Sequence, residues 1–311
     1  MRFFWTWQAN LVVLNDKSTH QLKLPSLSSI QQVKVYIFCY NESMTKINLL
    51  ALDLDGTLLT HDKKISDENK AAIKAAQAQG VHVVITTGRP LKAIEHILSE
   101  LDLLVASEYS ITFNGGLVQR NNGEILSQKT FSYEDLVELH EAFEQLNLPF
   151  DVISEGKCYE TNPKSLYQGF SPFLDFTMGD FDTIPKDIIL NKAVSAIDAD
   201  FLDQQIKKIP ASLKSKYEIF KSRDILLEIM PKGVVKSFGL EQLIAILGIE
   251  QASVMAMGDE ENDITMLSWA GLGIAMKNAT AEVKAIADVT APLTNDEHSV
   301  AWAIKTYILE D

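Results

Sequence analysis

The sequence predicts an α/β fold, in which a doubly wound parallel sheet carries an inserted α+β domain. From Met44 onward, short apolar runs alternate with amphipathic segments, which is the pattern of a parallel sheet flanked by helices. Between residues 130 and 231 the pattern changes to paired alternating runs that are typical of hairpins, and afterwards the first pattern returns. We therefore expect a core domain made of residues 44–129 and 232–311, with residues 130–231 inserted as a second domain.

Composition and charge narrow the possible functions. The 311 residues are enough for two domains, and 46% hydrophobic with 23% charged residues is ordinary for a soluble globular protein. A formal charge of -14 argues against nucleic acid as the main partner. No apolar run approaches the roughly 18 residues of a spanning helix, so no membrane partner is expected. Cys39 and Cys158 are the only cysteines, which fits a cytoplasmic location, and the scattered histidines predict no metal or catalytic role.

Residues 1–43 differ in character from the rest of the chain, with an aromatic start and more Lys and Arg than Asp and Glu. A signal peptide or a membrane anchor is one interpretation. Gln8 and Asn10 interrupt the apolar run, however, and no small-residue cleavage site follows. We expect instead that the fold begins at Met44 and that the preceding residues are an extension outside it.

The first predicted strand, residues 47–52, is an apolar run that suits burial on both faces. It ends in Asp53, Asp55 and Gly56. These residues also fit an ordinary strand end and turn, so a chemical role needs partners from elsewhere in the chain. A calcium loop is excluded, because an EF-hand has its glycine at about the sixth loop position and Gly56 falls earlier.

The second predicted strand also ends in groups that suit an anion. Ser66 caps the helix before it, and the strand Val81–Ile85 runs into Thr87 and Arg89. Pro90 is then able to begin a helix. The threonine hydroxyl and the free N–H groups of that helix start are suited to hold an anionic oxygen, and a simple capping threonine is the alternative.

The third predicted strand, near Tyr109–Phe113, ends in Asn114 and leads into a hairpin. The inserted domain follows with a helix, a hairpin, a strand, a helix from Phe201 to Ile209 and two further strands. This order predicts helices over an antiparallel sheet. The stretch between the first hairpin and the strand at Lys192 is expected to be a variable loop.

The last part of the chain contributes a lysine and an acidic cluster. Lys236 stands in the first turn of a predicted helix, where its charge opposes the helix dipole, and an ordinary surface lysine is the alternative. The strand Ser253–Met257 runs into a cluster that includes Asp259, Asn262 and Asp263. Its acids repel one another unless a cation or solvent relieves them. The later GLG sequence lacks the third glycine of a dinucleotide fingerprint.

These groups all follow the carboxyl ends of predicted strands or begin a helix there, so we expect them to meet at a topological switch point. Acids, a hydroxyl and a lysine together suit a phosphoryl group bound with Mg²⁺. The acids account for the metal, and the lysine and hydroxyl account for the remaining oxygens. Mg²⁺ is the expected cofactor and a small phosphorylated metabolite the expected partner.

The order of DLDGT, TTGR, a lysine and GDEEND resembles the four motifs of the haloacid dehalogenase superfamily. ITFNGGLV and GDEENDITML resemble its Cof-type sugar-phosphatase branch, and the resemblance covers nearly all of residues 44–311. It implies a Mg²⁺-dependent phosphatase whose α/β cap domain is inserted between the second and third motifs. It further implies that Asp53 is the nucleophile and that Asp55 is the general acid and base.

The resemblance also implies supporting roles. The residues implied to bind the phosphoryl group are Thr87, Lys236 and Asn262. The implied Mg²⁺ ligands are Asp53, Asp259 and the backbone carbonyl of Asp55. Asp263 would orient Lys236 or a metal-bound water, and Gly56 would let the chain turn beneath the acids. From their positions at strand ends beside the cluster, Arg89 and Asn114 are candidates for substrate contacts, and roles in stabilising their loops are the alternative. Ser237 departs from the family, which often has glycine after the lysine.

Other functions fit part of this pattern. A phospho-acceptor signalling domain also places acids, a hydroxyl and a lysine on a doubly wound sheet, but it has no use for the large inserted domain. A phosphomutase shares the chemistry and needs bisphosphate substrates. A binding protein without turnover is disfavoured because the full catalytic set is present.

Overall fold

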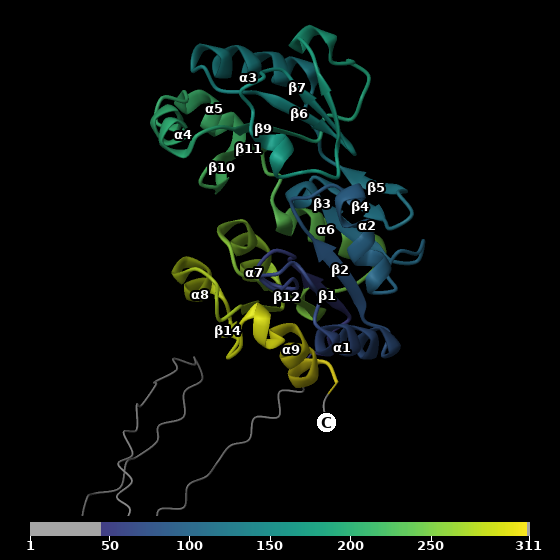
Figure 1. The fold of residues 1–311 in the computed structure, drawn as a ribbon. Coiled ribbons are helices and arrows are strands. Elements are labelled where there is room, and N and C mark those ends of the chain that lie inside the picture. Colours follow the sequence, from purple (N-terminus) through teal and green to yellow (C-terminus); the bar gives the residue numbers. More distant parts are fainter. Residues whose placement is uncertain (1–44, 310–311) are drawn as a thin grey trace, which may run out of the picture. The chain divides into compact units, whose positions relative to one another are not determined.

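The structure, a computed structural model, describes residues 45–309. The predicted extension, residues 1–43, lies outside the described residues. The described chain forms an eight-stranded sheet and a six-stranded sheet, each with its own helices (Figure 1). This confirms the predicted fold class. No helix in the described part of the chain is long and apolar enough to cross a membrane.

The larger sheet is built around β1, Leu49–Leu52, in the order β14-β13-β12-β1-β2-β3-β4-β5. β2, His82–Thr86, and β12, Val254–Gly258, flank β1 and run parallel to it. The chain moves outward from β1 on one side and later returns to β12 on the other, so β1 and β12 form the topological switch point. The remaining strands are β3 (Tyr109–Thr112), β4 (Leu117–Arg120), β5 (Ile125–Gln128), β13 (Leu272–Ala275) and β14 (Val289–Thr290).

Helices cover both faces of this sheet. They are α1 (Asp67–Ala78), α2 (Leu91–Glu100), α6 (Lys236–Leu247), α7 (Ile264–Trp269), α8 (Ala281–Ile286) and α9 (Ser299–Tyr307). The crossovers leave β1 and β12 in opposite directions, and their right-handedness puts α1 and α2 on one face and α7 and α8 on the other. α1 and α9 lie side by side, and α6 packs on α7 (Figure 1). β1 is therefore covered on both sides and fully buried, which explains its unbroken apolar run.

The six-stranded sheet and its helices form the cap, in the strand order β10-β11-β9-β6-β7-β8. Its strands are β6 (Asp151–Ser154), β7 (Lys157–Glu160), β8 (Asp175–Met178), β9 (Lys192–Ala196), β10 (Tyr217–Arg223) and β11 (Leu226–Pro231). Its helices are α3 (Tyr133–Gln145), α4 (Ala199–Ile206) and α5 (Ala211–Lys216). All neighbouring pairs except β7–β8 are antiparallel.

Two local predictions for the cap were wrong. The stretch expected to be a loop contains β8, a largely exposed edge strand parallel to β7, whose alternating DFTM sequence covers only four residues. The predicted helix from Phe201 to Ile209 is α4, which ends at Ile206, and a separate helix, α5, begins after Pro210. Proline has no N–H for the preceding turn, so it starts a new helix.

The interior of the cap contains a carboxylate. Asp151 begins β6 and is fully buried. One of its oxygens accepts a hydrogen bond from the Ser165 hydroxyl, whereas Oδ1 has no partner among the described residues. Burial raises the pKa of Asp151 to about 7 from an ordinary value of 3.8, against the lowering effect of Ser165. The folded cap therefore favours the protonated acid.

We expect Asp151→Asn to change how stability depends on pH. Between about pH 4 and pH 7 the unfolded chain has released the Asp151 proton while the folded chain still holds it, so the free energy of unfolding falls as pH rises, by roughly 4 kcal/mol at most. Asparagine keeps an acceptor for Ser165 and has no proton to lose. Urea unfolding followed by circular dichroism should therefore show a growing advantage of the variant as pH rises through this range. If the variant and wild type differed in free energy of unfolding by the same amount at about pH 4 and about pH 7, the prediction would be contradicted.

Candidate active site

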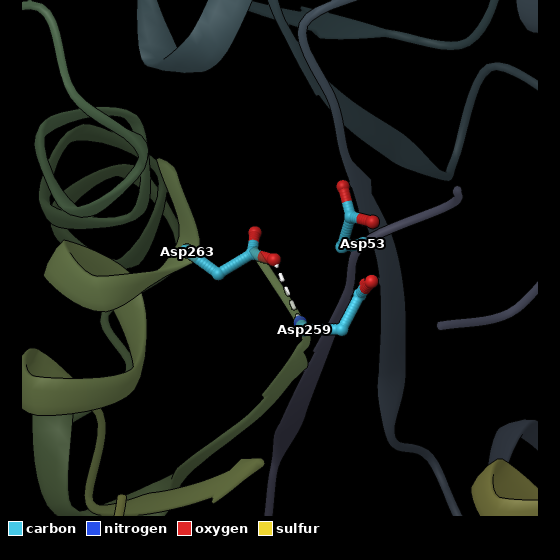
Figure 2. Close-up of side chains that lie close together, drawn as sticks. All are labelled: Asp53, Asp259 and Asp263. Atoms are coloured by element: carbon cyan, nitrogen blue, oxygen red, sulfur yellow. Dashed lines mark hydrogen bonds between the residues drawn. The ribbon is translucent and has the colours of Figure 1, made fainter. Parts of the chain in front are cut away.

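Three buried carboxylates meet where β1 and β12 end. Asp53 follows β1 directly, and Asp259 follows β12 directly. The pairing of Leu52 with Met257 in these parallel strands brings the two acids side by side. Asp263 ends the short 3-10 helix η5, Glu261–Asp263. One oxygen of each carboxylate lies within 4.8 Å of the others (Figure 2).

A buried lysine compensates part of this negative charge. Lys236 is the first residue of α6 and is fully buried. Its Nζ lies 2.6 Å from Oδ1 of Asp53 and 2.5 Å from Oδ1 of Asp263. Because its charge opposes the dipole of α6, these two ion pairs, rather than the helix, account for its position. The other oxygen of Asp263 accepts the backbone N–H groups of Asp259 and Glu260. With both oxygens engaged, Asp263 is better suited to hold Lys236 than to bind a metal.

Burial and the closeness of the charged groups shift the pKa values of Asp53, Asp259 and Lys236. Burial raises the pKa of Asp53 to about 7, although the charge of Lys236 opposes the rise. Burial, followed by the charge of Asp53, raises the pKa of Asp259 to about 8. Burial by itself would lower the pKa of Lys236, but its two carboxylate partners raise it above its ordinary value. A cation shared by Asp53 and Asp259 would relieve the crowding of these carboxylates.

The turn after β1 lies closely against the Asp259 carboxylate. Gly56 has a φ of +87°, and a Cβ at this position would lie 2.1 Å from Oδ2 of Asp259. Thr57 donates its hydroxyl proton to Oδ1 of Asp259 over 2.7 Å. Asn278 holds the turn from the other side by donating to the carbonyl oxygen of Gly56 over 2.8 Å. Glycine is therefore required both for the backbone conformation and for the closeness of the carboxylate.

Asp55 has entirely different partners. Nη2 of Arg89 lies 2.7 Å from both of its oxygens, and Nε donates to Oδ2 over 3.0 Å. Nζ of Lys63 lies 2.7 Å from Oδ1. Burial would raise the pKa of Asp55, but Arg89 and Lys63 together lower it below its ordinary value. The two acids of DLDGT thus have opposite shifts. Arg89 contacts Asp55 here, and its predicted contact with substrate stays a prediction.

The other predicted residues lie at the neighbouring strand ends. Thr87 follows β2, and its Oγ1 accepts the N–H of Arg89 over 3.2 Å, which leaves the hydroxyl proton able to donate. Asn114 follows β3, and its side-chain oxygen accepts from Nδ2 of Asn262 over 3.2 Å. The ends of β1, β2, β3 and β12 therefore surround one site, as expected for a topological switch point.

Several residues of this site were not predicted from the sequence. Thr57 binds Asp259 and Lys63 binds Asp55, whereas Lys192 and Glu228 reach the site from the cap. The only sequence signal for the cap pair is a charged residue inside an otherwise buried strand. Because a buried charge needs a partner, this signal predicts that a partner exists, but it does not identify the residue.

The sequence and the fold are similar to those of known proteins. The sequence model of the haloacid dehalogenase-like hydrolase family matches residues 50–304. YxeH of Bacillus subtilis (strain 168) is 35% identical over 266 residues, which are 84% of this chain and 98% of YxeH. The 5-amino-6-(5-phospho-D-ribitylamino)uracil phosphatase YcsE of the same strain is 33% identical over 264 residues, 85% of this chain and 96% of YcsE. The solved structure of the subclass IIB sugar phosphatase BT4131 is 27% identical, with a TM-score of 0.71 and coverage of 85% of this chain and 99% of BT4131. The chain belongs to the haloacid dehalogenase-like hydrolase family, which confirms the predicted family and makes the protein a hydrolase.

We expect Mg²⁺ to stabilise the wild-type protein and Gly56→Ala to abolish this effect, because the new methyl group displaces the Asp259 carboxylate. The change also strains the backbone, at a cost of about 1 kcal/mol. Gly80→Ala is the matched control, since Gly80 has a φ of +83° and nothing lies within 4 Å of its added Cβ. Addition of Mg²⁺ should raise the melting temperature of wild type and of Gly80→Ala, but not that of Gly56→Ala. If Mg²⁺ raised the melting temperature of Gly56→Ala as much as that of wild type, the close approach of Asp259 to Gly56 would not matter for Mg²⁺ binding.

Proposed function

We propose that this protein is a Mg²⁺-dependent phosphatase that hydrolyses small phosphorylated metabolites through an aspartyl-phosphate intermediate. The observation that carries the proposal is the contrast between the two acids of DLDGT. Asp53 lies among acids beside a buried lysine, whereas Asp55 is held by Arg89 and Lys63. Two carboxylates whose surroundings shift their pKa values in opposite directions are suited to different catalytic roles.

The proposed Mg²⁺ ligands are Asp53, Asp259 and the backbone carbonyl of Asp55. The donor set fits, because Mg²⁺ takes oxygen ligands and is commonly bound by one or two carboxylates together with a phosphate oxygen. Thr57 engages one oxygen of Asp259, and the other oxygen lies closely against Gly56. When bound, the ion would supply positive charge for the phosphoryl oxygens.

Asp53 is the proposed nucleophile. Lys236 holds Oδ1, so the second oxygen is the one to form the bond to phosphorus while the bond to the leaving oxygen breaks. The ammonium of Lys236, the hydroxyl of Thr87 and the amide of Asn262 would neutralise or hydrogen-bond the phosphoryl oxygens. A water then attacks phosphorus and frees Asp53 with release of phosphate.

Asp55 is the proposed general acid and base. It would protonate the leaving oxygen in the first step and take a proton from water in the second. Arg89 and Lys63 favour its ionised form here. The acid role therefore requires that a bound substrate draw Arg89 away from Asp55, which agrees with the prediction that Arg89 contacts substrate.

The relatives and the cap support a small metabolite as substrate. YcsE is named for a phosphorylated ribitylamino compound, and BT4131 is described as a sugar phosphatase. A cap over the site would exclude solvent and select the leaving group. We propose domain limits at residues 129 and 231, because the chain leaves one sheet after β5 and leaves the other at the end of β11. A cytoplasmic location is proposed from the cysteine content.

A phosphomutase shares this chemistry and would need bisphosphate substrates. A phospho-acceptor signalling domain would leave the cap without a purpose. Both alternatives predict little phosphate release from simple monoesters.

We expect Asp53→Asn to lower kcat at least about a thousandfold, because the amide cannot form the phosphoenzyme. Released phosphate should be measured against a panel of phosphorylated sugars, cofactors and nucleotides, with and without Mg²⁺. Wild type should release phosphate from some members and only with the metal. Undiminished release by Asp53→Asn would remove the covalent mechanism from consideration.

Asp55→Asn should affect substrates according to their leaving group. A poor leaving group, such as a sugar alkoxide, needs the proton in the first step, and we expect a loss of about a hundredfold or more in kcat/KM. p-Nitrophenolate leaves without help, so its ester should lose less in that step. Steady-state kinetics on both esters tests this, and equal losses would argue against Asp55 as the acid.

A further inference from the structure

A buried polar chain runs from the cap to the phosphate site. Glu228 of β11 lies opposite Val194 of β9, two residues from Lys192, so both charged side chains stand on the same face of the cap sheet. They are 7% and 3% exposed, and Nζ of Lys192 lies 3.1 Å from Oε2 of Glu228. Burial of both charges gives this pair a fixed geometry that an exposed pair lacks.

Each member of the pair also contacts the core. Nζ of Lys192 donates to the carbonyl oxygen of Gly88 over 3.2 Å, in the loop that carries Thr87 and Arg89. Oε2 of Glu228 accepts from Nδ2 of Asn114 over 3.1 Å. The hydroxyl of Ser222 donates to the other oxygen of Glu228 over 2.9 Å, which keeps the carboxylate from turning.

Glu228 determines the direction of two amide groups. An ionised carboxylate only accepts hydrogen bonds, so Asn114 must turn its NH₂ group toward Glu228. Its oxygen then faces away, where it accepts from Nδ2 of Asn262. Asn262 is therefore also oriented, with one of its two amide protons engaged and the other left for a phosphoryl oxygen.

The backbone holds Asn114 between the two domains. Asn114 and Phe113 both have left-handed backbones, with φ of 54° and 52°. The N–H of Asn114 donates to the carbonyl oxygen of Thr87 over 3.0 Å, and a Cβ on Gly88 would lie 3.0 Å from Oδ1 of Asn114. Left-handed non-glycine residues cost free energy and are retained where the surroundings impose them, commonly at functional sites.

We propose that Glu228 is a positioning residue that orients Asn262 through Asn114, and that Lys192 holds Glu228 in register with the Gly88 loop. Phosphate binding then depends on the position of the cap, because Asn114 loses its partner when the cap moves away. The inference rests on the proposed function, in which Asn262 contacts the phosphoryl group.

The test uses the full-length protein with Mg²⁺ and measures inhibition of p-nitrophenyl phosphate hydrolysis by inorganic phosphate. Glu228→Ala should raise the inhibition constant of phosphate and the KM by about tenfold, since Asn114 is left unpaired and free to turn. Glu228→Gln keeps an acceptor oxygen for Asn114 and should stay within about threefold of wild type. A role in folding alone would change the melting temperature without changing the affinity for phosphate.

Two further variants separate the polar chain from its surroundings. Glu228→Ala leaves Lys192 buried without its ion pair, so the double variant Lys192→Met/Glu228→Leu, which removes both charges, should show the same rise in the inhibition constant. Asp175→Asn is the control. It breaks the 2.7 Å ion pair between Asp175 of the cap and Lys92 of the core, which lies outside this chain, and should leave the constant unchanged.

Three results would overturn the proposal. An unchanged inhibition constant in Glu228→Ala and the double variant, with an active wild type, would overturn it and leave the proposed function standing. A loss of activity confined to larger substrates in the Glu228 variants would also overturn the proposal, because it would mean that Glu228 contacts the leaving group. A wild-type protein that neither hydrolyses phosphate esters nor binds phosphate with Mg²⁺ would overturn the proposed function and this inference with it.

Discussion

The buried ion pairs of Lys236 are the interaction on which the rest of the site depends. Three buried carboxylates with oxygens within 4.8 Å of one another repel strongly, and Lys236 is fully buried between two of them. The loop after β3 packs closely on the start of α6, the helix that begins at Lys236. A Cβ on Gly115 would lie 2.1 Å from the carbonyl oxygen of Val235. The acids, the start of α6 and the Asn114 loop therefore form one packed unit.

Chain topology explains why the acids meet at this place. β1 and β12 are neighbours in the sheet, although about two hundred residues separate Thr57 from its partner Asp259. In the turn that follows β1, Asp55 is bound by Arg89 and Lys63 and lies outside the acid cluster. Two acids separated by one residue thus have opposite electrostatic surroundings, and this contrast is the physical basis for assigning them different roles.

The cap contributes more than a cover. The two members of a buried cap pair, Lys192 and Glu228, each bind the core, and an exposed ion pair joins Asp175 of the cap to Lys92 of the core. The exposed pair contributes little free energy because solvent screens it. The buried pair is geometrically demanding, since each charge must keep its partners. A movement of the cap is therefore expected to change the hydrogen bonds of Asn114 before it changes those of the acid cluster.

Much of this protein could be predicted from its sequence, because buried parallel strands require unbroken apolar runs and helices require caps such as Ser66. The order of the four motifs also identified the family. β8 was missed because it is a largely exposed edge strand of only four residues, and Glu228 was missed because its partner Asn114 is 114 positions away. Residue types and their order were thus readable along the chain. Only tertiary structure decided which charges became neighbours, and the opposite pKa shifts of Asp53 and Asp55 arise from those neighbours.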